Sequence, residues 1–224
     1  MAVSRPAGDT GGADPAVTAV LAAYAAGAAT EHAVLIAVAA SRLLVPVVAV
    51  LAEANADGSV PTALAPGPFG PPSEKETEMA LPTLVGNDGR KAVIAFTGTD
   101  TVRRWRADAR PVPVPAARLW PAVAAEQADA VVIDVAGPVP LVVEGARLRA
   151  LANGAPPPLP YEDPDIRAQV AAVVGGFSLE PGGPDADLTI TLKAPDLAAA
   201  RAAAEAIAAR LAPRLRRGIA IRVG

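Results

Sequence analysis

The stretch EKETEMALPTLVGNDGRKAVIAFTGTDTVRRW, residues 74–105, decides how this sequence is interpreted. It contains an acidic run, an apolar run, a polar turn, a second apolar run and a basic run. The apolar runs, residues 79–85 and 92–96, predict two strands. The intervening GNDGRK carries an Asp-Gly pair, which indicates a tight hairpin turn because both positions tolerate positive φ. The stretch therefore predicts a β-hairpin flanked by opposite charges.

The regions on both sides of this hairpin predict further strands and helices. Thr99 or Asp100 is expected to cap a short helix that ends at Trp105. The upstream run LLVPVVAVL, residues 43–51, is apolar throughout, which favours a strand covered on both faces. The other expected elements are helices from 15 to about 27, 30–41, 116–127 and 145–151, a proline-rich edge strand at 111–115, and a second hairpin at 130–134 and 140–144.

Three consecutive prolines and an Asn-Gly pair mark the clearest boundary in the chain. This segment, residues 153–164, predicts a stiff, extended linker. Beyond it we expect a helix (165–174), a Gly/Pro loop (175–184), a strand (188–192), a helix (196–211) and a strand (219–223), so that the last two strands run parallel. The predicted organisation is a disordered N-terminus (1–13), an α/β domain (14–152), the linker, and a smaller α-β-α-β domain (165–224).

The predicted fold class is thus α/β, in the α+β sense: a mixed sheet with β-hairpins and flanking helices, followed by the smaller domain. Hydrophobic residues make up 52% of the 224 residues but aromatic residues only 3%, so Ala, Val and Leu must fill the core. The most membrane-like run, residues 33–52, contains Arg42 and Pro46, which favour a buried helix and strand over a transmembrane span. No signal peptide is expected at the N-terminus.

The overall charge and the absence of cysteine exclude several classes of function. The 20 basic and 23 acidic residues give a net charge of −3, and no long basic stripe is present, which argues against nucleic-acid binding. Cysteine is absent, which excludes disulfides, thiolate catalysis and Cys-ligated metals. We therefore expect a cytoplasmic protein with no nucleic-acid or membrane partner and no cofactor.

Two charged clusters are the candidate binding residues. Glu74, Glu76 and Glu78 alternate, so an extended backbone would present all three carboxylates on one side. They are interpreted as a solvated entry to the hairpin; a polar contact surface and a site for a hard cation such as Mg²⁺ or Ca²⁺ are the alternatives.

The basic cluster follows the hairpin. It consists of Arg103, Arg104 and Arg106 with Arg110, and arginine suits carboxylates and phosphates because its guanidinium can form paired hydrogen bonds. Pairing with the nearby acidic run is the simplest interpretation, and a site for an anion or acidic partner is the alternative. Trp105 lies between the arginines and is expected to pack against the hairpin rather than on a ligand.

No catalytic residues are predicted. His32 is the only histidine, and without a GxSxG nucleophile motif it offers weak support for a Ser–His–Asp triad. The turn GNDGRK lacks the spacing and final hydroxyl of a phosphate-binding loop. The protein is therefore not expected to be an enzyme.

Residues 74–105 together with SRLLVPVVAV (41–50) resemble the N-terminal domain of bacterial SseB-family proteins. Residues 108–116 and 130–151 are also similar to that family, so the resemblance extends over about residues 14–155. It implies a compact α/β domain and no established catalytic residues.

The function expected from the sequence is a non-catalytic protein-interaction or regulatory module with an unidentified protein partner. The alternative is a small-molecule or anion sensor, or an enzyme, that uses Glu and Arg groups in an interdomain cleft. A homo-oligomer, formed through the exposed face of the Ala-rich C-terminal helix, is a third expectation.

Overall fold

The computed structural model describes residues 11–47, 83–86, 89–194 and 196–224. Within these ranges the chain forms seven helices and nine strands, an α+β composition as the sequence predicts. The chain divides into two compact units, each described by itself below. Unit 1 comprises Met1–Asp14 and Ala39–Glu144, and unit 2 comprises Pro15–Val38 and Gly145–Gly224. In these described ranges no helix is both long and apolar enough to cross a bilayer.

Unit 1 contains a two-stranded and a four-stranded sheet. In the first, β1 (Arg42–Val47) pairs antiparallel with the proline-rich β4 (Arg110–Pro115). The second has the order β2-β3-β5-β6. A bridge between Leu44 and Phe96 joins the two sheets. The strands of the second sheet are β2 (Thr83–Val85), β3 (Lys91–Ala95), β5 (Ala130–Ile133) and β6 (Leu141–Glu144).

Both predicted hairpins are confirmed, and a parallel pair joins them. β2 pairs antiparallel with β3, and β5 pairs antiparallel with β6. β3 and β5 run parallel, so the sheet is mixed. The turn between β2 and β3 ends at Gly89, whose φ of 79° fits the Asp-Gly signal. The preceding Asn87 and Asp88, residues 79–82 of the first predicted strand and residues 48–51 of the 43–51 strand lie outside the described residues.

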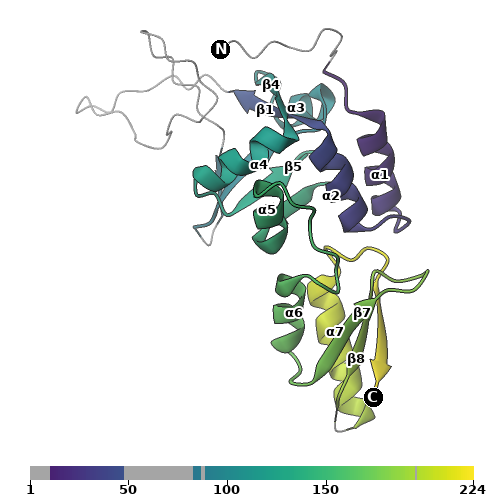
Figure 1. Cartoon of the computed structure of the whole chain (residues 1–224). Helices are drawn as coiled ribbons and strands as arrows, with labels where there is room; N and C mark the ends of the chain where they lie inside the picture. The colour runs from purple at the N-terminus through teal and green to yellow at the C-terminus, as the bar shows by residue number, and fades with distance from the viewer. Residues whose placement is uncertain (1–10, 48–82, 87–88, 195) are drawn as a thin grey trace. The chain divides into compact units, whose positions relative to one another are not determined.

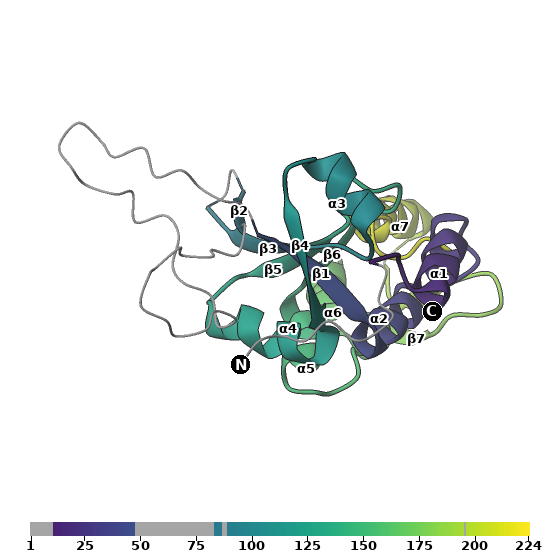
Figure 2. The ribbon, with the colours of Figure 1, turned by 90° about the horizontal axis from the view of Figure 1, so that it is seen from above.

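Two helices flank the four-stranded sheet. Helix α3 (Thr99–Trp105) and helix α4 (Ala116–Ala125) lie on opposite sides of the strands (Figure 2). α4 buries Leu119, Trp120 and Val123, each no more than 1% exposed. The expected side-chain cap of α3 is wrong: the capping position is Gly98, which has no side chain to accept from the first N–H groups of the helix.

Unit 2 combines N-terminal helices with the C-terminal part of the chain. Helix α1 (Pro15–Ala25) and most of α2 (Glu31–Ala40) belong to it, and Thr30 Oγ1 accepts from the Ala33 N–H to cap α2. The remaining elements are α5 (Gly145–Ala152), α6 (Pro164–Ala171), β7 (Phe177–Pro181), β8 (Leu188–Leu192), α7 (Leu197–Leu211) and β9 (Ile219–Val223). The structure thus groups these helices differently from the sequence-based division at residues 153–164.

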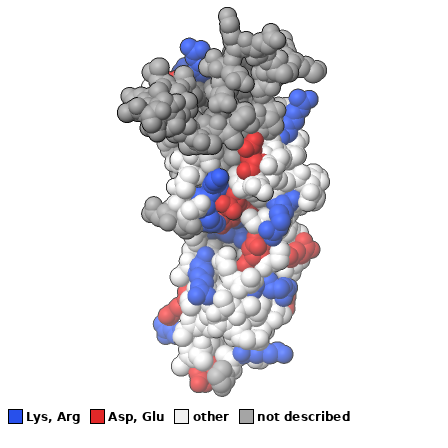
Figure 3. Space-filling model, turned by 90° about the vertical axis from the view of Figure 1, so that its left-hand side faces the viewer, with Lys and Arg blue, Asp and Glu red and all other residues white. Residues whose placement is uncertain are grey.

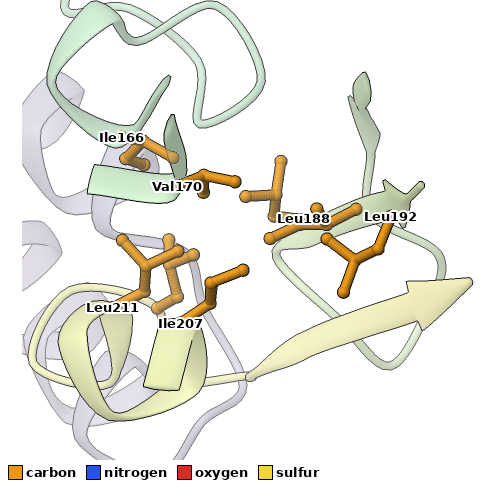
Figure 4. Close-up of a cluster of buried hydrophobic side chains, with 8 residues drawn as sticks. Ile166, Val170, Leu188, Leu192, Ile207 and Leu211 are labelled. Carbon is orange, nitrogen blue, oxygen red and sulfur yellow. The ribbon is translucent and has the colours of Figure 1, made fainter. Parts of the chain in front are cut away.

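Within unit 2, the last three strands form a sheet in the order β7-β8-β9, with β8 and β9 parallel as expected. Helices α6 and α7 cover one face of it (Figure 1). Leu188, Ile190 and Leu192 alternate along β8 and are fully buried. Figure 4 shows β8 side chains meeting those of Ile166 and Val170 from α6 and Ile207 and Leu211 from α7.

One prediction in this region is wrong. The segment expected to be a Gly/Pro loop, residues 175–184, contains the strand β7. Its apolar residues alternate: Phe177 and Leu179 pack against the helix-covered core, whereas Ser178 and Glu180 are exposed. The order after the linker is therefore α-β-β-α-β rather than α-β-α-β. The flanking glycines and prolines favour a loop, and a strand of only five residues gives too short an apolar pattern to outweigh them.

Candidate functional site

Helix α3 is anchored to the sheet of unit 1 by its apolar side. Val102 is 1% exposed and belongs to a buried cluster with Leu44, Ile94 and Phe96. The Trp105 ring lies 5.5 Å from the Phe96 ring, centroid to centroid, at an interplanar angle of 39°. Trp105 therefore packs against the end of the hairpin, as its bulk suggested. The helix offers a fixed base for its outward side chains.

The start of α3 is fixed by a buried carboxylate. Asp134, which is 3% exposed, accepts hydrogen bonds from the Thr97 N–H (2.9 Å) and the Thr97 hydroxyl (2.7 Å). Asp134 adopts a positive φ of 52°, a conformation that aspartate tolerates better than most residues. Arg42 donates to the Thr97 carbonyl at 2.9 Å. These bonds hold the backbone that leads into the helix.

The arginines of α3 and of the residue that follows it lie on the outside. Arg103, Arg104 and Arg106 are all exposed. Arg103 approaches Asp100 at 3.8 Å, and the exposure of these two side chains, 74% and 87%, makes the pair weak. Arg106 forms a two-pronged contact with Asp108 at 2.8 and 3.2 Å, and this hydrogen bonding lowers the pKa of Asp108. Within the described residues, the ion pairs of Arg103 and Arg106 are thus local.

The same side of the sheet exposes apolar side chains. The strand registers place Leu84, Ile94, Val132 and Val142 on one face, because directly paired residues and those two positions apart share a face. Val102 of α3 shares a buried cluster with Ile94, and Val132 packs against that cluster. Leu84 and Val142 remain 37% and 45% exposed.

The same face carries an ion pair, in which the Arg90 guanidinium lies 2.6 Å from Glu144 Oε2. We call the exposed part of this face, with Leu84, Val142 and the outward arginines of α3, the α3 surface.

The structure thus brings together some of the predicted site residues. Helix α3 and its C-cap residue carry four of them on one face of the four-stranded sheet: Arg103, Arg104, Trp105 and Arg106. Glu74, Glu76 and Glu78 lie outside the described residues, so their pairing with the arginines and their cation binding stay predictions. The sensor alternative and the absence of catalysis also stay predictions.

The only histidine occupies the second position of α2. Within the described structure the Nδ1 atom of His32 is buried and has no hydrogen-bond partner. No hydroxyl or carboxylate partner of a triad contacts it there.

Sequence reasoning missed a buried charge network in unit 2. Arg147 donates to Glu31 Oε1, and Arg214 donates to Glu31 Oε2 at 3.0 Å and to Asp163 Oδ2 at 2.5 Å. Glu31 is 5% exposed, Arg147 3% and Asp163 0%. Two carboxylates and two guanidiniums balance one another, which is what permits charges to be buried at all.

This network joins four elements: the first residue of α2, the first turn of α5, the N-cap of α6 and the turn after α7. Burial lowers the pKa of Arg214, but Glu31 and Asp163 outweigh that effect and raise it overall. The Tyr24 hydroxyl lies 3.1 and 3.0 Å from the carbonyls of Pro213 and Arg214, and burial raises its pKa, so it stays a donor. Asp163 before Pro164 was recognisable as a cap; its distant partner was not.

One face of the molecule shows no strong segregation of charge by sign. On the face seen in Figure 3, blue and red side chains are interspersed. This pattern agrees with the nearly balanced composition.

Comparison with known proteins gives one match. Neither a search of curated proteins nor a search of solved structures finds a match to this chain. The family described as SseB protein N-terminal domain matches residues 17–150. That range contains unit 1 from its first strand onward, helix α2, and most of α1 and α5. It is more than half of the 224 residues. The chain therefore belongs to the SseB family.

Proposed function

We propose that the chain acts without catalysis, as a protein-interaction module that binds an acidic partner at the α3 surface. The observation that carries this proposal is that α3 has one apolar side packed against the sheet and one charged side exposed to solvent. Its apolar side is fixed by Val102 and Trp105, and the arginines point away from the core. A guanidinium held on a rigid element loses less freedom on binding than one on a loose loop, so its hydrogen bonds contribute more to affinity.

The chemistry of the surface supports a protein partner. Interfaces are enriched in arginine and aromatic residues around an apolar centre. The α3 surface combines exposed arginines, the half-buried Trp105 and the exposed side chains of Leu84 and Val142. The arginines favour carboxylates because each can donate two parallel hydrogen bonds. The partner is thus expected to present Asp or Glu next to an apolar side chain.

Co-purification from the native host tests this function. The full chain is compared with an Arg103→Ala/Arg104→Ala variant and with a Leu84→Asp variant. Arg118→Ala is the matched control, because Arg118 is an exposed arginine on α4, on the other side of the same sheet. We expect a specific protein to be captured by the wild type and the control and lost from both α3-surface variants. An identical set of captured proteins for all four chains would remove the proposed surface.

A further inference from the structure

Among the residues that the structure describes, the sheet of unit 2 ends in an edge strand without a second neighbour. In the described residues β9 pairs only with β8. Gly224 donates its N–H to the Leu192 carbonyl, and the Gly218 carbonyl accepts from the Asp187 N–H. In a parallel ladder alternate residues bond to the same neighbour. The even-numbered backbone groups of β9 therefore face β8, and those of Ile219, Ile221 and Val223 face outward.

This edge lacks the features that usually protect an edge strand. Proteins block edges with proline, bulges or inward-pointing charges. β9 has no proline, and its one charge, Arg222, lies across the open face of the sheet at 3.4 Å from Glu180 of β7. The opposite edge, β7, ends in Pro181. Val223 is 54% exposed, and Ile219 and Ile221 are half-buried.

Helix α7 has a flank on the same side as this edge. Arg210 reaches the Gln169 carbonyl of α6, so the side of α7 that carries Arg210 faces α6. Successive residues turn by about 100° around a helix. Leu197, Arg201 and Glu205 therefore lie on the flank away from α6, which is the flank next to β9. Leu197 is 78% exposed, the highest value among the exposed large hydrophobic residues described.

We infer that the occupant of this edge is a second copy of the chain, related by a two-fold axis. An antiparallel pair of β9 strands centred on Ile221 places Ile219 opposite Val223 of the other copy. The outward N–H and C=O groups of all three residues then find partners, and a six-stranded sheet results. Isologous two-fold contacts of this kind are the commonest form of soluble oligomer.

The charges of α7 agree with the same axis. α7 runs back along β8 and β9, so a two-fold axis through the middle of β9 also passes near the middle of α7. Arg201 and Glu205, which form an i,i+4 pair at 3.1 Å, then meet Glu205 and Arg201 of the second copy. The exposed flank of α7 is therefore complementary in charge to the same flank of the second copy. The exposed Leu197 and Val223 lie at the end where β9 finishes and α7 begins, and the second copy covers them.

Sedimentation velocity on the full chain over a range of concentrations tests the inference. The wild type is expected to reach twice the 22.4 kDa monomer mass as concentration rises. Arg201→Glu alone and Glu205→Arg alone place like charges together and should each weaken dimerisation on the order of tenfold. The double variant Arg201→Glu/Glu205→Arg restores opposite charges and should recover the wild-type dimer. Arg210→Glu, on the α6 side of the same helix, is the matched control.

A strand variant provides the second arm. Ile221→Pro removes an outward N–H while leaving the N–H groups that bond to β8, and it should abolish the dimer while circular dichroism stays unchanged. If it unfolds the chain, Val223→Lys replaces it, with the same expectation. A wild type that stays monomeric at all concentrations overturns the inference. So does a dimer that the single charge reversals and the strand variant leave intact.

Discussion

Replacing Arg214 by methionine removes the cation that two buried carboxylates share. Asp163 is fully buried and has Arg214 as its guanidinium partner, at 2.5 Å; Glu31 keeps Arg147 but loses its 3.0 Å contact. Removing one member of a buried ion pair costs about 3–5 kcal/mol, because the remaining charge stays desolvated without compensation. We expect the Arg214→Met variant to lose about that much free energy of unfolding.

Urea denaturation of the full chain, followed by circular dichroism, measures this loss. A double variant, Arg214→Met/Asp163→Asn, removes the uncompensated charge and should recover part of the stability. Arg216→Met is the matched control, because Arg216 lies two residues away and contacts the Tyr24 ring through a cation–π interaction at 5.5 Å, worth about 0.5–1 kcal/mol at an exposed site. A loss below about 1 kcal/mol for Arg214→Met would refute the view that the network holds unit 2 together.

Three further predictions follow from individual contacts. Asp134→Ala leaves the buried Thr97 groups without an acceptor and should lower the free energy of unfolding by about 1–3 kcal/mol, measured by urea denaturation; an unchanged midpoint contradicts this. Gly145→Ala, at a φ of 58°, puts a Cβ 2.1 Å from Asp165 Oδ2 and should lower the melting temperature, whereas Gly154→Ala, with open space around it, should lower it less. Burial raises the pKa of the Asp187 carboxyl, so the folded chain binds a proton there more tightly than the unfolded chain does. The free energy of unfolding should therefore fall as pH rises from the ordinary pKa of 3.8 through the higher pKa of the folded chain. Asp187→Asn should flatten that part of the profile of stability against pH.

The strands of unit 1 could be predicted because each one carries its own signal. Alternating or continuous apolar runs bounded by turn residues located β3, β5 and β6, and the Asp-Gly pair located the hairpin. The sequence does not predict β7, because its two apolar residues, Phe177 and Leu179, lie between glycines and prolines. These neighbours favour a loop. The N-terminal end of α3 was misassigned because Thr99 and Asp100 are good caps in general, whereas Gly98 occupies the capping position.

The candidate site was predictable only in its local part. Arg103, Arg104 and Trp105 are adjacent in sequence, so one helix carries them together. The buried network was not predictable, since Glu31 and Arg214 are 183 positions apart and each resembles an ordinary surface residue. Nothing in a single sequence indicates that such distant charges meet, because the pairing depends on the tertiary arrangement of four elements.

The distance in sequence between Glu31 and Arg214 also bears on how the chain is made. Chains leave the ribosome from the N-terminus at about 5–20 residues per second. Because 183 positions separate the two residues, the carboxylate of Glu31 is synthesised roughly 10–40 s before the guanidinium that neutralises it. Until then Tyr24 also lacks the carbonyls of Pro213 and Arg214. We therefore expect α1 and α2 to reach their final packing only after Arg214 has left the ribosome.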